Sequence, residues 1–165
     1  MMRIQGKKFT YVKQRRTLPN GIVTQIEMIE YPSAALIVPF LSADRIIFLK
    51  QFRVVLGKTL YELPAGTADR GESALACARR ELPEETGYAA KKITRLGHIY
   101  PVPGYSTEVI HIFKAQQLFP RKADKDFDEI IQTVILTRAE IRKLFRQKKI
   151  TDGKTICALA FCGII

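Results

Sequence analysis

Apolar and polar residues alternate near the start of the chain, and this pattern predicts β-strands. The stretch from Phe9 to Ile29 alternates on both sides of Pro19-Asn20-Gly21. An Asn-Gly pair between two strand-like runs is a strong hairpin signal. The N-terminal region is therefore expected to be an arm rich in strands.

Further apolar runs predict a second group of strands. Two of them, Ala34–Phe40 and Arg45–Gln51, are joined by the polar turn Ser42-Ala43-Asp44 and read as a pair. A third and shorter run, Leu60–Leu63, stops at Pro64-Ala65-Gly66. Proline and glycine together are typical of a strand end.

The period changes from two to about 3.6 after Ser73, which predicts a helix that extends to about Glu85. Leu75, Ala78 and Leu82 recur at helical spacing and are expected to face the core. Gly87 follows at the position where a helix often ends on a left-handed residue.

The rest of the chain predicts three strands, one loop and two helices. The residues Thr137–Glu140 have the form of a capping box, and Asp152 begins the last helix. The strands are 93–99, 108–116 and 130–136, and the loop is 124–129. On the first helix, Ile141, Leu144 and Phe145 are expected to face inward. On the second helix, Ile156, Leu159 and Ala160 are expected to do so.

This order of strands, helix, strands and helices predicts one mixed α/β domain built in layers. Short turns join most strands, so the sheet should be mixed or antiparallel. The chain has 165 residues, of which 47% are hydrophobic and 26% charged, as in ordinary globular domains. No apolar run approaches the ~20 residues that span a bilayer, so no membrane partner is expected.

The cysteines and the N-terminus predict a cytoplasmic protein. The three cysteines, Cys77, Cys157 and Cys162, are odd in number and lack C-x-x-C spacing, so free thiols are expected. Residues Met1–Lys8 are polar and basic with no apolar stretch behind them, which is unlike a secretory signal.

The net charge of +11 favours anionic partners. Nucleic acid is possible, but small molecules that carry phosphates fit equally well. The basic clusters lack the interleaved aromatic residues that read single strands, so nucleic acid is not favoured. These clusters are Lys7-Lys8, Lys13–Arg16, Lys91-Lys92 and Arg142–Lys149.

The chemistry is concentrated between Gly66 and Tyr88, where Glu72, Glu81, Glu84 and Glu85 lie in one loop and helix. Glu81 and Glu85 are about 40° apart on a helix surface. Carboxylates this close repel one another unless a cation lies between them, and oxygen-rich sites suit Mg²⁺ or Mn²⁺. Acidic residues on a helix are more often simply a solvated face, so the glutamates alone would carry little weight.

The full spacing, with Arg80 before Glu81, resembles the Nudix box over 23 residues. The resemblance implies an α/β/α sandwich with a mixed sheet, in a domain of residues 34–165 after an N-terminal arm of residues 1–33. It also implies metal binding by Glu81, Glu84, Glu85 and the Ala65 carbonyl. Arg80 would orient Glu81, and Glu72 would support the loop.

The box departs from the usual pattern at two positions. Tyr88 takes the place of an aliphatic residue, and Pro83 falls inside the predicted helix. Proline removes a backbone donor and crowds the carbonyl four residues earlier, so a kink or a loosened last turn is expected.

The flanks resemble the ADP-ribose pyrophosphatase group of the family, which implies hydrolysis of ADP-ribose to AMP and ribose 5-phosphate. Arg53 and Glu62 lie in its segment before the box, and Pro103, Gly104 and Glu108 lie in the loop beside its terminal ribose. The group also has a catalytic glutamate, best matched by Glu129, with Asp126 and Asp128 as competitors. Members are usually homodimers that exchange N-terminal strands.

Two alternatives remain open from the sequence. The first is a Nudix enzyme with another substrate: a nucleotide sugar, a dinucleoside polyphosphate, a nucleoside triphosphate or an RNA 5′ end. The second is a Nudix domain that senses a nucleotide without cutting it. The complete set of Arg80, Glu81, Glu84 and Glu85 argues against the second.

Overall fold

The computed structural model describes residues 1–123 and 130–165. The predicted loop 124–129 lies outside the described residues. The strands are β1 (Met2–Gln5), β2 (Thr10–Thr17), β3 (Val23–Glu30), β4 (Ala34–Pro39), β5 (Arg45–Arg53), β6 (Lys58–Glu62), β7 (Ala65–Thr67), β8 (Tyr88–Ile99), β9 (Ile110–Pro120) and β10 (Ile131–Thr137). The helices are η1 (Val54–Leu56), α1 (Ala74–Thr86), α2 (Arg138–Arg146) and α3 (Gly153–Phe161).

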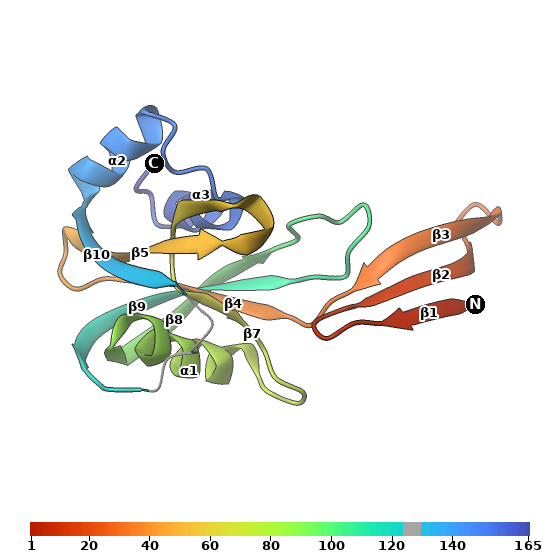
Figure 1. The fold of residues 1–165 in the computed structure, drawn as a ribbon, viewed down its shortest axis with the longest axis horizontal. Helices are drawn as coiled ribbons and strands as arrows, with labels where there is room; N and C mark the ends of the chain where they lie inside the picture. The colour runs from red at the N-terminus through yellow and green to blue at the C-terminus, as the bar shows by residue number, and fades with distance from the viewer. Residues whose placement is uncertain (124–129) are drawn as a thin grey trace.

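The first three strands form an arm that extends away from the body of the molecule (Figure 1). Strands β2 and β3 are the predicted hairpin, and Gly21 at φ 82° allows the turn between them. The Leu18 amide donates to the Ile22 carbonyl at 2.8 Å and closes the turn. The sequence missed β1, which pairs antiparallel with β2 at the edge of the arm.

The body contains two sheets, with strand orders β10-β5-β6 and β7-β4-β9-β8. Strands β4 and β9 run parallel and the other pairs are antiparallel, so the predicted mixed arrangement is confirmed. The expected pairing of β4 with β5 is wrong, because the two strands belong to different sheets and share only the bridge between Phe40 and Ile46. Each is a central strand whose two edges are already occupied by other partners.

The helices lie on both sides of the strands (Figure 1). Alternate residues of β4 serve two cores: Ala35 and Ile37 pack with α1, while Leu36 and Val38 pack with α3. This division follows from the period of two, since successive side chains of a strand point to opposite faces. The predicted layered α/β domain with an N-terminal strand arm is therefore confirmed.

Helix α1 begins at the N-cap Ser73, whose hydroxyl accepts from the Ala76 amide at 3.2 Å. It ends at Gly87, where φ is 77° and the amide donates to the Pro83 carbonyl at 2.9 Å. The last turn after Pro83 is therefore closed rather than loosened. The predicted inward stripe needs one correction, because Leu75 is 38% exposed and Cys77 is buried instead.

The two C-terminal helices begin as predicted. Thr137 and Glu140 form a complete capping box, and Asp152 caps α3 by accepting from the Thr155 amide at 3.1 Å. Two inward assignments are wrong: Phe145 is 38% exposed and Ala160 is exposed. In each case the short helix packs through a narrower stripe than its apolar residues suggest.

Two further features bear on the sequence predictions. All three cysteines are free thiols. In residues 1–123 and 130–165, no helix is long and apolar enough to cross a membrane.

Candidate active site

Glu81 lies directly against the backbone of Gly66. A Cβ atom on Gly66 would be only 1.8 Å from Oε1 of Glu81, so any side chain at position 66 would displace the carboxylate. The site therefore brings β7 and the middle of α1 into contact. Only glycine leaves room for a carboxylate at this distance from a strand.

Arg80 connects the acidic residues of the box. Its guanidinium donates to Glu81 Oε1 at 2.7 Å and to Glu84 Oε2 at 3.1 Å. On its other side it donates to both carboxylate oxygens of Glu72, at 3.2 and 3.1 Å, and to the Thr67 carbonyl at 3.1 Å. A planar guanidinium with five donors can make these contacts at once, whereas an ammonium cannot.

The electrostatics of Arg80 and Glu72 agree with this geometry. The hydrogen bonds that Arg80 donates to Glu72 raise the pKa of the Arg80 guanidinium, and the nearby charge of Glu81 adds to the effect. The hydrogen bond from Arg80 lowers the pKa of Glu72 below its ordinary value. Glu72 Oε2 also accepts from the Asp69 amide at 2.9 Å, so Glu72 fastens the loop before the helix.

Glu85 is buried at the end of α1, beside the start of β7. Its Oε2 accepts from the Ala65 amide at 2.9 Å. Its backbone carbonyl accepts from the Thr133 hydroxyl of β10 at 3.5 Å. Glu85 thus contacts both sheets, through its carboxylate to β7 and through its backbone carbonyl to β10.

The oxygen atoms around Ala65 and Gly66 fit a hard divalent cation. Glu81 contacts Gly66 closely, Glu85 binds the Ala65 amide, and Glu84 shares Arg80 with Glu81. Carboxylate and carbonyl oxygens are the ligands that Mg²⁺ and Mn²⁺ prefer. Within the described part of the chain, no three His, Cys, Asp or Glu side chains are already grouped as a metal site, and Arg80 pairs with both Glu81 and Glu84.

A second charged cluster is centred on Glu62, which is 1% exposed. Arg53 binds it with two hydrogen bonds, from Nε at 2.7 Å and from Nη2 at 2.5 Å. Lys154 of α3 donates a short hydrogen bond to the same carboxylate and another to Asp152 at 2.9 Å. Strands β5 and β6 and helix α3 therefore meet at one buried carboxylate.

The charges in this cluster keep Glu62 ionised. Burial alone would raise the pKa of Glu62, but Arg53 and Lys154 outweigh it and the pKa is lowered. The hydrogen bonds to Glu62 raise the pKa of Arg53, and the charges of Asp152 and Glu85 contribute in the same direction. Arg53 thus lies within electrostatic reach of the box glutamate Glu85, which joins the two clusters.

The loop between β8 and β9 lies beside the second cluster. Pro103 and Lys154 line the same cavity of about 480 Å³, which is mostly apolar. Glu108, at the end of this loop, is half-buried, and burial raises its pKa while the charge of Lys154 opposes the rise. Gly104 is exposed and does not line the cavity.

The structure brings most of the sequence-predicted site residues together in these two clusters. Glu129, the expected catalytic glutamate, lies outside the described residues, as do Asp126 and Asp128. Sequence reasoning did not single out Lys154. No local signal marks it, because its partner Glu62 lies on another element, 92 residues earlier in the chain.

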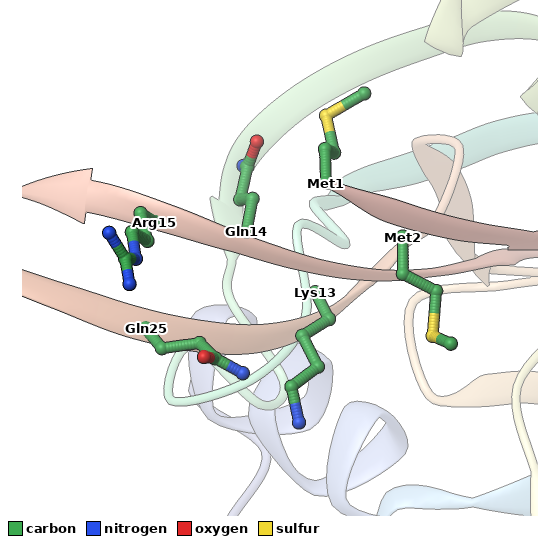
Figure 2. A pocket seen from close by; sticks show the side chains of 6 residues that line it. All are labelled: Met1, Met2, Lys13, Gln14, Arg15 and Gln25. Carbon is green, nitrogen blue, oxygen red and sulfur yellow. The ribbon is translucent and has the colours of Figure 1, made fainter.

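A separate cavity of about 440 Å³ lies on the arm. Figure 2 shows the side chains that line it, and all six come from β2, β3 and the first two residues. None of these lining residues is acidic, and none belongs to either charged cluster. They are Met1, Met2, Lys13, Gln14, Arg15 and Gln25.

Comparison with known proteins gives a consistent result. Residues 30–159 match the family model for the NUDIX domain. The chain is 36% identical to the ADP-ribose pyrophosphatase of Bacillus subtilis (strain 168), over 94% of this chain and 85% of that protein. It is 33% identical to a methanol dehydrogenase activator of Bacillus methanolicus, over 87% and 79% of the two chains. A crystal structure titled as an ADP compounds hydrolase superposes with a TM-score of 0.83 at 26% identity, over 96% of this chain and 86% of that one.

Proposed function

Because this chain belongs to the Nudix family of hydrolases, we propose that it hydrolyses the diphosphate in ADP-ribose, giving AMP and ribose 5-phosphate. The observation that carries this proposal is the contact between Glu81 and Gly66, with Arg80 holding Glu81 and Glu84. It explains why the box needs glycine, arginine and glutamate at these spacings. The similarity to an ADP-ribose pyrophosphatase supports the choice of substrate.

The residues that would hold Mg²⁺ or Mn²⁺ are Glu81, Glu84, Glu85 and the Ala65 carbonyl. Divalent cations bound there would neutralise the diphosphate charge and make its P–O bonds more susceptible to water. Arg80 keeps Glu81 and Glu84 on one side of α1. The Ala65 amide fixes the Glu85 carboxylate beside the same backbone.

Arg53 is the best candidate for binding the diphosphate itself. Its guanidinium is held in a fixed orientation by the buried Glu62, and it lies within electrostatic reach of Glu85. A fixed guanidinium recognises phosphate well because little rotamer freedom is lost on binding. Pro103, Gly104 and Glu108 would contact the terminal ribose, and Glu129 is proposed to accept the proton.

The chain would act as a homodimer through its N-terminal arm, residues 1–33. The arm leaves β1 as an edge strand and exposes large apolar side chains. Such an edge is an association surface unless a partner covers it. A mass in solution equal to one chain would refute the dimer. The exposed apolar residues of the arm are Met1, Met2, Ile4, Phe9, Leu18, Ile22 and Val23.

Turnover of a substrate panel with Mg²⁺ tests the proposal. AMP and ribose 5-phosphate should form fastest from ADP-ribose, and the reaction should vanish in Glu85→Gln. Glu140→Gln is a matched control, because glutamine also completes a capping box and Glu140 lies far along the chain from the box. The three free thiols fit the cytoplasmic location at which ADP-ribose would be met.

Two outcomes would change the assignment. Faster turnover of GDP-mannose, diadenosine polyphosphates, nucleoside triphosphates or 5′-triphosphate RNA would keep the metal site and replace the substrate. Tight nucleotide binding with no turnover of any member would favour a nucleotide sensor.

A further inference from the structure

The N-terminal arm is fastened to the loop between β8 and β9. The Ile29 amide of β3 donates to the Tyr105 carbonyl at 2.7 Å, and the Thr107 amide donates to the Ile29 carbonyl at 3.0 Å. Ile29 and Ser106 thereby form a parallel bridge outside the main sheets. Residues far apart in the sequence are joined here at the base of the arm.

The Thr107 side chain adds two hydrogen bonds to the backbone of Tyr31. Its hydroxyl accepts from the Tyr31 amide at 2.9 Å and donates to the Tyr31 carbonyl at 3.3 Å. Tyr31 also stacks on Phe9, with ring centroids 6.4 Å apart, so this residue is tied to the arm on its other side. The Thr107 hydroxyl therefore connects the loop to the arm.

The loop itself ends at a residue near the charged cluster. The Ser106 amide donates to the Val102 carbonyl at 3.0 Å, and the Ser106 hydroxyl accepts from the Glu108 amide at 3.1 Å. The charge of Lys154 acts on Glu108. Lys154 also donates to the Glu62 carboxylate, which accepts from Arg53 as well. A shift of residues 105–107 would therefore move Glu108 relative to the cluster.

We propose that Thr107 is a positioning residue, whose hydroxyl couples the N-terminal arm to the loop Val102–Glu108 and so holds Glu108 in place for substrate binding. This inference rests on the proposed function. The hydrogen bonds of Thr107 connect it to Ile29 and Tyr31 of the arm, so its loss should weaken substrate binding and leave the chemical step intact. The arm thereby affects the site even without contributing a residue to it.

The test uses Thr107→Val, which keeps the branched shape and removes both hydroxyl bonds, and Thr107→Ser, which keeps the hydroxyl. Thr17→Val is the control, because Thr17 is an exposed threonine at the far end of β2. With ADP-ribose, Thr107→Val should raise KM roughly three- to tenfold, as expected for one or two exposed hydrogen bonds, with kcat nearly unchanged. Amide hydrogen exchange at Tyr31 should become faster, Thr107→Ser should restore both values, and Thr17→Val should change neither.

The outcomes separate this inference from the proposed function. Faster exchange at Tyr31 with KM unchanged would overturn the positioning role, as would a fall in kcat at constant KM. ADP-ribose affinity is also measured by calorimetry in the Glu85→Gln background. Suppose that the wild-type protein cuts no substrate but that Thr107→Val weakens its affinity for ADP-ribose. That result would refute the proposed function and support the positioning role of Thr107.

Discussion

Oε1 of Glu81 occupies the position that a side chain on Gly66 would need, with only 1.8 Å between it and a Cβ at that residue. The glycine that begins the box is thus in direct contact with the glutamate fifteen residues later. A side chain at position 66 would therefore push the Glu81 carboxylate away from the Ala65–Gly66 backbone.

The first prediction is that Gly66→Ala reduces kcat about a hundredfold, since small misplacements of a catalytic group have effects of that size. The methyl group would force the Glu81 carboxylate away from the Ala65–Gly66 backbone. Steady-state kinetics and thermal unfolding should be measured together. An alanine variant with normal kcat would show that Glu81 has no fixed place in the site.

The second prediction concerns Arg80, whose guanidinium binds Glu72, Glu81, Glu84 and the Thr67 carbonyl. Arg80→Lys keeps the charge but cannot make these contacts together, so the free energy of unfolding should fall by about 1–3 kcal/mol. Activity should fall with it. Arg79→Lys is the matched control, because Arg79 is the exposed neighbour on the same helix. Equal behaviour of the two variants would contradict the role of Arg80.

The third prediction is a pH dependence that originates at Glu62. Its pKa in the folded protein is lowered from the ordinary 4.5, so the ionised carboxylate stabilises the fold above that value. This stabilisation is lost as the pH falls below 4.5 through the lowered pKa. Urea unfolding between pH 3 and 6 should show the loss in the wild type.

Lys154→Met tests the origin of that dependence. The variant removes one of the two cations at a carboxylate that is 1% exposed, so the pKa of Glu62 should rise and the free energy of unfolding should drop at neutral pH. The loss of stability on acidification should be smaller than in the wild type, because the window between 4.5 and the pKa of Glu62 in the folded protein becomes narrower. Identical dependence of stability on pH in the two proteins would show that Lys154 does not affect the pKa of Glu62.

The fourth prediction concerns Pro83, which is buried inside α1. Pro83→Ala supplies an amide for the Arg79 carbonyl and removes a cost of about 3 kcal/mol, but it also deletes buried ring carbons. The two effects oppose each other, so the melting temperature should rise slightly or stay the same. Calorimetry with and without Mg²⁺ would measure this. A clear drop in stability or in metal affinity would show that the proline shapes the last turn.

The sequence by itself determined the local elements and the chemistry of the box. The turn at Asn20-Gly21, the capping box at Thr137, the helix starts near Ser73 and Asp152, and the stop at Gly87 were all predicted, because each depends on residues a few positions apart. The spacing of Arg80 and Glu81 likewise lies on a single helix. Such features are local and can be inferred without knowing the fold.

Only the tertiary structure decided which distant segments meet. Nothing local distinguishes β4 and β5 as members of different sheets, since both are apolar runs and the choice depends on which strands occupy their edges. The same reason explains why Lys154 was not singled out: its partner Glu62 is 92 residues away, and the pair exists because α3 packs beside β6. Contacts of this kind result from the packing of whole elements and leave no periodic pattern in the sequence.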